Sequence, residues 1–213
     1  MAMETAEPLY PLVSLARLRM DIDGEGVTTL IAGASCPLSC KWCINKAVLR
    51  KPSKAVTPQE LFDRVKIDDL YFQATGGGVT FGGGESLLHI NFIQAFRKVC
   101  GNAWKIYAET ALHVPTEAID AAAEIIDGFI VDIKDMNPKI YKAYTGKDAT
   151  LPHENLQKLL SLAGPERILV RIPLIPDFNT PEDQNRSLET LKAMGLTRFD
   201  PFSYVIREEM LSN

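Results

Sequence analysis

The sequence predicts an α/β protein built around a parallel β-sheet. Short β-rich runs alternate with helical patterns about six times along the 213 residues. Strand–helix units in series join parallel strands through right-handed crossovers, and helices then cover the sheet. No low-complexity linker or internal repeat interrupts the series, so we expect one domain over residues 1–213. Such a sheet is either doubly wound or closed into a complete or partial barrel.

The predicted elements follow from local patterns in chain order. The strands are short runs rich in β-branched and aromatic residues, namely 27–32, 78–81, 104–109, 129–133, 168–175 and 198–205. The helices show apolar residues at helical spacing, and they are 57–66, 90–100, 115–126, 138–144, 153–162 and 180–194. Two of them begin with a threonine N-cap followed by proline, at Thr57-Pro58 and Thr180-Pro181.

Charge and hydropathy exclude two classes of partner. Lys and Arg total 23 against 27 Asp and Glu, so no broad basic field is present to bind nucleic acid. A small basic run from Lys46 to Lys54 is interpreted as a solvated loop, with a docking patch as the alternative. Residues 1–12 carry no signal-peptide pattern and are expected to be an N-terminal extension. No apolar run reaches membrane-spanning length, so we expect a cytoplasmic protein with no membrane partner.

Three of the four cysteines lie within eight residues, at Cys36, Cys40 and Cys43, spaced C-x3-C-x2-C. A structural zinc site needs four ligands, usually in two pairs, and the remaining Cys100 and three scattered histidines form no second pair. A disulfide framework is typical of much smaller secreted chains. The spacing favours a [4Fe–4S] cluster with three protein thiolates and one open iron. A zinc-stabilised α/β binding module is the non-enzyme alternative.

Polar residues follow the predicted strands at the points where the strands end. The carboxyl ends of parallel strands meet at one edge of the sheet, where ligands bind in both architectures. Polar side chains in apolar strands are costly unless they serve a site or are paired. Besides the cysteine loop, the residues placed there are Gly82, Gly83, Gly84, Glu85, Glu109, Thr110, Asp132, Lys134 and Arg171.

Taken together, these motifs resemble those of radical S-adenosylmethionine (SAM) enzymes. Within that superfamily the sequence is most similar to glycyl-radical-enzyme activases of the pyruvate formate-lyase activating type. The resemblance runs in order over nearly the whole chain. It is carried by the cysteine triplet with Trp42 and by the segments 23–26, 75–85, 109–110, 132–136, 145–146 and 170–176.

The resemblance implies a partial (β/α)6 barrel that binds a [4Fe–4S] cluster and SAM. In the family, SAM chelates the open iron, and one electron from the reduced cluster cleaves it to methionine and a 5′-deoxyadenosyl radical. In an activase this radical abstracts hydrogen from a glycine of a partner enzyme, and an electron donor such as flavodoxin or ferredoxin supplies the electron. The alternative within the superfamily is a different peptide or small-molecule substrate. Anaerobic activity is expected.

The resemblance also implies roles near the cluster. The three cysteines are the implied iron ligands, and Trp42 is similar to an aromatic residue beside the adenine. Glycines at 82–84 let the backbone approach the methionine amino group of SAM, and Glu85 follows them directly. The chain has no second, ferredoxin-like cysteine set, so no ferredoxin-like insert and no additional cluster are expected.

Further cofactor contacts are implied at the ends of the third and fourth strands. Glu109, Thr110, Asp132 and the adjacent Ile133 correspond to a family site where carboxylates, SAM and sometimes a monovalent cation meet. The family often has Asp where this chain has Glu109, which puts the cation in doubt.

Lys134 and Arg171 are the implied catalytic cations, because fixed positive charges bind the SAM carboxylate. Arg171 pairing with a structural acid is the alternative. Family members carry a histidine after the last strand's Pro-aromatic pair, where this chain has Ser203. The nucleoside contact is therefore expected to be weakened or supplied by another residue. The sequence ends at Asn213, before a further segment typical of the family, and we expect a more open rim or a covering partner.

Overall fold

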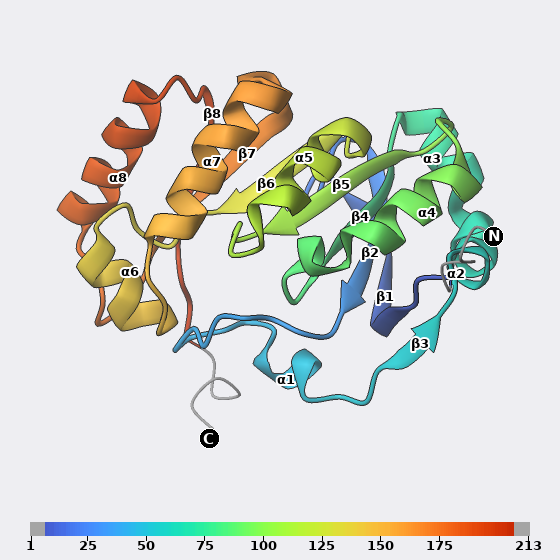
Figure 1. Ribbon diagram of the computed structural model, residues 1–213, viewed down its shortest axis with the longest axis horizontal. Coiled ribbons are helices and arrows are strands. Elements are labelled where there is room, and N and C mark those ends of the chain that lie inside the picture. The colour runs from blue at the N-terminus through green and yellow to red at the C-terminus, as the bar shows by residue number, and fades with distance from the viewer. Residues whose placement is uncertain (1–6, 207–213) are drawn as a thin grey trace, which may run out of the picture.

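The computed structural model describes residues 7–206. All eight strands of this part of the chain belong to one sheet, in the order β3-β1-β2-β4-β5-β6-β7-β8 (Figure 1). From β2 to β8 every neighbouring pair is parallel, whereas β1 pairs antiparallel with both β2 and β3. The strands are β1 (Tyr10–Met20), β2 (Val27–Gly33), β3 (Lys54–Val56), β4 (Gly78–Gly83), β5 (Lys105–Thr110), β6 (Gly128–Asp132), β7 (Ile168–Leu174) and β8 (Arg198–Ser203).

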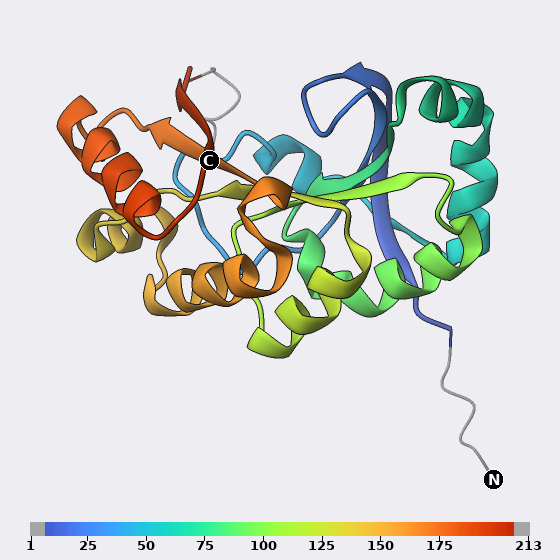
Figure 2. The same cartoon turned by 90° about the horizontal axis from the view of Figure 1, so that it is seen from above.

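The helices connect successive parallel strands, as a βα series requires. Figure 2 shows α4, α5 and α7 on one side of the sheet and the turn between β1 and β2 on the other. The helices are α1 (Lys46–Leu49), α2 (Pro58–Val65), α3 (Asp69–Thr75), α4 (Ile90–Cys100), α5 (Thr116–Ile125), α6 (Pro138–Thr145), α7 (Thr150–Ala163) and α8 (Pro181–Ala193), with 3-10 turns at Lys66–Asp68, Ser86–His89 and Pro165–Arg167.

The six parallel strands are the six predicted ones, and the fold is a partial (β/α)6 barrel. Both predicted threonine N-caps are confirmed as capping boxes. The Thr57 hydroxyl accepts from the Glu60 backbone while the Glu60 carboxylate accepts from the Thr57 backbone, and Thr180 and Asp183 repeat the arrangement at α8. Helices α2 and α8 therefore begin at Pro58 and Pro181, as the sequence predicts.

The N-terminal strand corrects one prediction. Residues 1–12 were expected to form an extension, but Tyr10, Pro11 and Leu12 begin β1, and Tyr10 is fully buried. Residues 1–6 lie outside the described part. The period-two pattern of β1 is broken at two register shifts, between Leu12 and Ser14 and again further along, so alternation does not reveal the strand. The short β3, α1 and α3 were also not predicted.

The apolar core lies between the sheet and the helices on its outer side. It includes an aromatic cluster in which Phe81, Phe92 and Phe96 contact one another edge-on or stacked. Trp104 is buried beside Phe96, and its indole N–H donates to Asp69 at 2.6 Å. Because this packing fills the outer side, the polar strand ends are left for the opposite, inner side of the barrel.

Candidate active site

The cysteine loop follows β2 and is fixed by backbone hydrogen bonds to the glycine run. The Gly84 amide donates to Gly33 O at 3.0 Å, and the Glu85 amide donates to Ser35 O at 2.9 Å. The Asn45 amide group closes the other end of the loop, donating to Gly83 O at 2.7 Å. These contacts hold the three cysteines against the carboxyl end of β4.

Contacts to α6 and to the segment after β7 support the far side of the same loop. The Ser39 amide donates to Thr145 O at 2.9 Å, and the Lys41 amide donates to Tyr144 O at 3.1 Å. The Trp42 indole N–H donates to Pro176 O at 3.1 Å. Trp42 thus connects the loop to the chain beyond β7, and its indole N–H is hydrogen-bonded within the protein.

Neighbouring atoms come so close to two positions of the run that only glycine fits there. A Cβ on Gly84 would lie 2.0 Å from Ser35 O, and one on Gly82 would lie 2.5 Å from Glu109 Oε2. No side chain fits at such distances without moving the backbone of the cysteine loop or the carboxylate. The glycine run therefore allows the ends of β2, β4 and β5 to meet in one place.

The three thiols are free and line a single cleft. Burial raises the pKa of Cys40 to about 11 and also raises that of Cys36. A bound metal centre supplies the positive charge that deprotonates such thiols. Within residues 7–206, no group of three His, Cys, Asp or Glu side chains is placed to hold a single metal ion. Three thiols along one cleft fit a cluster with three protein ligands, whereas a closed zinc site needs four.

The cleft contains most of the site residues that the sequence predicts. Its walls come from the cysteine loop, from the ends of β4, β5, β6 and β7, and from the segment after β8. Its lining residues are Cys36, Leu38, Cys40, Cys43, Ile44, Asn45, Gly83, Gly84, Glu85, Glu109, Thr110, Ala111, Asp132, Lys134, Arg171 and Tyr204. The predicted Trp42, Gly82 and Ile133 are absent from this lining.

A second hollow of about 550 Å³ adjoins the cleft along β8. It shares Ile44, Asp132, Arg171 and Tyr204 with the cleft, and it also contains Ser203. The two hollows are therefore neighbours and together extend from the cysteines toward the last strand. Its walls combine apolar and charged groups, which suits a ligand with an aromatic and a polar part.

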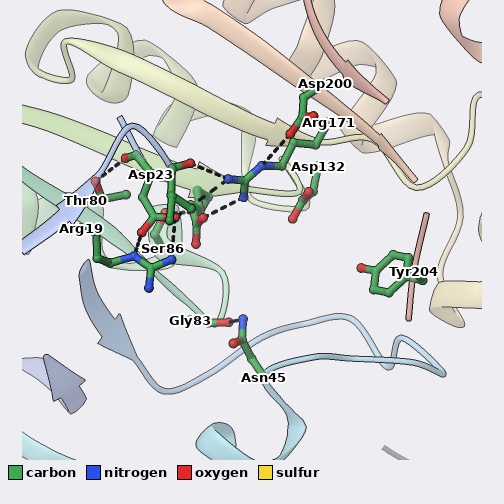
Figure 3. A network of polar contacts seen from close by, with 12 residues as sticks. Arg19, Asp23, Asn45, Thr80, Gly83, Ser86, Asp132, Arg171, Asp200 and Tyr204 are labelled. Atoms are coloured by element: carbon green, nitrogen blue, oxygen red, sulfur yellow. Dashed lines mark hydrogen bonds and ion pairs between the residues drawn. The ribbon is translucent and has the colours of Figure 1, made fainter. Parts of the chain in front are cut away.

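Arg171 on β7 is surrounded by acids (Figure 3). Its Nη1 donates to Glu109 Oε1 at 2.8 Å, and its Nη2 donates to Ile22 O at 2.8 Å. Asp200 lies 3.7 Å from Nε, and Asp23 lies 3.9 Å from Nη2. Arg171 thus pairs with acids of the chain, and its contact with the SAM carboxylate stays a prediction.

Asp23 lies in the turn between β1 and β2 and is buried. Its carboxylate accepts from Arg19, and its backbone carbonyl accepts from the Thr80 hydroxyl. The turn thus extends into the inner side of the barrel and contacts β4 and β7. The motifs include Asp23 only as part of segment 23–26 and predict no role for it in the site.

Burial raises the pKa of Glu109 to about 7, although Arg171 favours its charged form. The neighbouring Glu85 is buried and its pKa is raised by desolvation, while hydrogen bonds from Thr110 Oγ1 at 2.6 Å and from the Ala111 amide at 2.9 Å oppose the shift. Glu85 therefore connects the end of β4 to the end of β5, and its predicted role in cofactor binding stays a prediction.

Lys134 is the buried cation with the weakest pairing at this site. It is 7% exposed, and its Nζ lies 3.4 Å from both Asp132 Oδ2 and the Tyr204 hydroxyl. Burial opposes its charge, yet Asp132, Tyr204 and Cys40 raise its pKa above the ordinary value. An ammonium with only long contacts has capacity for a further anion. Tyr204 was not predicted as a site residue, and it lies just beyond the end of β8.

Comparison with known proteins agrees with this geometry. Residues 30–198 match the family model of the Radical SAM superfamily. The chain belongs to the radical SAM superfamily. This match confirms the resemblance inferred from the motifs.

Among curated relatives, the (2S)-3-sulfopropanediol sulfolyase activating enzyme of Bilophila wadsworthia is 25% identical over 85% of this chain and 81% of its own length. The pyruvate formate-lyase 2-activating enzyme of Escherichia coli is 27% identical over 82% of this chain and 70% of its own.

The solved structures show the same fold at low sequence identity. The crystal structure of Streptococcus suis SuiB bound to S-adenosylmethionine superposes with a TM-score of 0.65 and 13% identity, covering 84% of this chain and 40% of that one. This chain therefore spans less than half of that protein. Among the described residues, no helix is long and apolar enough to cross a membrane.

Proposed function

We propose that this protein holds a [4Fe–4S] cluster and SAM in the cleft and installs a glycyl radical on a partner enzyme. The observation that carries the proposal is the meeting of three free thiols, a close-packed glycine run and the incompletely paired Lys134 in one cleft. Relatives named as activating enzymes, matched over 81% and 70% of their lengths, support the activase branch.

Cys36, Cys40 and Cys43 are the proposed iron ligands, and Gly83 and Gly84 form the wall beside them. When bound, the reduced cluster supplies the electron that cleaves SAM into methionine and the hydrogen-abstracting 5′-deoxyadenosyl radical. Lys134 is proposed to hold the SAM carboxylate, since its ammonium is buried and only loosely paired. The protein orients the ligand and excludes competing reactions.

Arg171 has a different proposed role. Its guanidinium donates to Glu109 and to Ile22 O, and Asp23 and Asp200 lie within 4 Å, so acids of the chain already balance its charge. We assign it to holding Glu109 at the mouth of the cleft. A monovalent cation beside Glu109, Thr110 and Asp132 is a weaker proposal, because Glu109 is occupied by Arg171 in this structure.

The adjoining hollow is the proposed nucleoside pocket. Phe202, Tyr204 and Val205 provide apolar surface, while Asp132 and Asp200 provide acceptors for ribose hydroxyls. Tyr204 replaces the family histidine in this proposal, with Ser203 beside it. A flavodoxin- or ferredoxin-type donor and a cytoplasmic location complete the proposal, since the three thiols must remain reduced.

Anaerobic reconstitution followed by SAM-cleavage assays tests the proposed function. The wild-type protein should bind about four irons per chain and form 5′-deoxyadenosine only with reductant. Cys40→Ala should lose both properties, while the matched control Cys100→Ala should keep them, because Cys100 lies in the core at the end of α4. A full cluster without 5′-deoxyadenosine formation contradicts the proposal, and one bound zinc per chain supports the binding-module alternative.

The activase assignment needs a separate measurement. A candidate glycyl radical enzyme, incubated with the reconstituted protein, SAM and reductant, should develop the doublet electron paramagnetic resonance signal of a glycyl radical. SAM cleavage that proceeds without this signal on any candidate, but with modification of a peptide or small molecule, favours the other radical SAM interpretation.

A further inference from the structure

The segment that contains the cysteine loop is basic, although the chain as a whole is acidic. Residues 26–59 contain five Lys and Arg and no Asp or Glu, whereas the full sequence has 27 acids and a net charge of −4. Two further lysines lie on α6 and directly after it. We call these seven side chains the basic surface, and they are Lys41, Lys46, Arg50, Lys51, Lys54, Lys142 and Lys147.

The two parts of the basic surface lie beside the cysteine loop, although they are far apart in the sequence. Lys46 begins α1, and its amide donates to Cys43 O at 3.2 Å. On the other side, the carboxyl end of α6, which contains Lys142, accepts the hydrogen bonds from the Ser39 and Lys41 amides. Figure 1 shows the loop, in blue, running between α1 and α6. The basic surface therefore flanks the cysteine loop on both sides.

The charges of the basic surface are available to a partner. Six of the seven side chains are exposed, and Lys46 is half-buried. Among residues 7–206, none of the seven forms an ion pair with an acid. By contrast, the exposed Lys66 and Lys192 each pair with an acid three residues away. Neighbouring cations without acids repel one another, so an anionic partner would stabilise this surface.

The cysteine loop itself is a thin wall of the cleft. Leu38, Cys40 and Cys43 line the cleft, whereas Ser39 and Lys41 are exposed and do not line it. None of residues 34–45 is fully buried. On this side, the loop alone therefore separates solvent from a redox group held by the three cysteines. The basic surface surrounds the place where an external electron donor would come nearest to that group.

We propose that the basic surface docks an acidic electron-transfer protein that reduces the cluster. This inference rests on the proposed function. The partner loses one electron and the cluster gains it, and the step forms no bond and moves no proton. Complementary charges bring such a partner to the loop and orient it there. The docking alternative for the run from Lys46 to Lys54 is thereby preferred over a solvated loop.

Two observations favour a compact acidic protein over other partners. A long polyanion such as DNA would also meet the acidic remainder of this chain, because the net charge is −4 in spite of the basic surface. The partner would also leave the substrate side free, since the cleft continues into the hollow along β8 and not toward the outer side of the loop. An electron donor and a substrate can therefore bind at the same time.

Stopped-flow absorbance tests the inference by following cluster reduction with a reduced flavodoxin of acidic surface as the probe. The test variant is Lys51→Glu/Lys142→Glu. The control is Lys98→Glu/Lys192→Glu, which reverses exposed lysines of α4 and α8 and has the same net charge. At low salt, the test variant should be reduced at least about 10-fold more slowly than the wild type, and the control should stay close to it.

The wild-type rate should itself fall with added salt, because the Debye length shrinks from about 30 Å at 0.01 M to about 3 Å at 1 M. Equal rates in the two double variants, or a wild-type rate that does not change with salt, would overturn the inference. Photoreduced 5-deazariboflavin, a small reductant that needs no docking surface, should reduce all three proteins equally. If the wild type forms no 5′-deoxyadenosine with this reductant, the proposed function is contradicted instead.

Calorimetry of flavodoxin binding to the cluster-free protein gives a readout that does not involve electron transfer. The test variant should bind at least about 10-fold more weakly than the wild type and the control at low salt. A DNA duplex serves as the competing polyanion. If the charge reversals weaken binding of the duplex but leave the flavodoxin affinity unchanged, the surface is a nucleic-acid site and the inference is wrong.

Discussion

Replacing Gly84 by alanine should disrupt the cysteine loop directly. The new Cβ would lie 2.0 Å from Ser35 O, whereas real Cβ contacts are essentially never under 3.0 Å, so a backbone must move by at least 1.0 Å. Overpacking of this kind costs about 1–3 kcal/mol. Losing the hydrogen bond from the Glu85 amide to Ser35 O adds about 1 kcal/mol. The unfolding free energy should therefore fall by about 2–4 kcal/mol.

For a domain of this size, the loss corresponds to a fall in melting temperature on the order of 10 °C. Cluster uptake should fall as well, because Ser35 immediately precedes Cys36. The control is Gly76→Ala, where the backbone is left-handed with φ at 70° but no atom lies within 4 Å of the new Cβ. That variant should lose only about 1 kcal/mol through backbone strain and should load iron normally. Equal melting temperatures and iron contents for the two variants would refute the packing argument.

Three further predictions concern the cleft. Burial raises the pKa of Glu109 from 4.5 to about 7, so the folded cluster-free protein takes up a proton between these values and loses stability as the pH rises through them. Urea unfolding at several pH values should show Glu109→Gln without this decline, which amounts to at most about 3 kcal/mol. Tyr204→Phe removes one of two contacts of Lys134 and should weaken SAM binding about 3- to 10-fold by calorimetry; unchanged affinity contradicts the role. Asn45→Ala removes the bond to Gly83 and should lower the melting temperature by about 2–4 °C.

The sequence predicts the parallel strands well because their signal is local. The runs at β2, β6 and β7 are short, apolar and bounded by turns, and a strand buried on both faces has that composition. Strand β1 is not predicted because two register shifts break its alternation and because an antiparallel strand needs no continuous apolar run. Its existence depends on pairing with β2 and β3, which only the folded chain reveals.

The sequence predicts a site residue where a cysteine or a charged residue follows or ends a predicted strand. The cysteines, Glu109 and Lys134 were found in this way, and they line one cleft. The partners of Arg171 were not predicted, because Ile22 O is a backbone group and Asp200 is distant in sequence. Tyr204 was also missed as a site residue, since an aromatic residue after a strand has no distinguishing local pattern.

The guanidinium of Arg171 also affects the shape of the half-barrel. Strands β2 and β7 are four steps apart in the sheet, about 19 Å if the sheet were flat. Arg171 nevertheless reaches Ile22, in the turn that enters β2, at 2.8 Å. An incomplete barrel has no hydrogen-bonded seam between its first and last parallel strands, β2 and β8. Side chains bridge the gap instead, because Arg198 on β8 also lies 3.5 Å from Glu25 in the same turn. The width of the open side is thereby coupled to the charges of the acids that these two arginines contact.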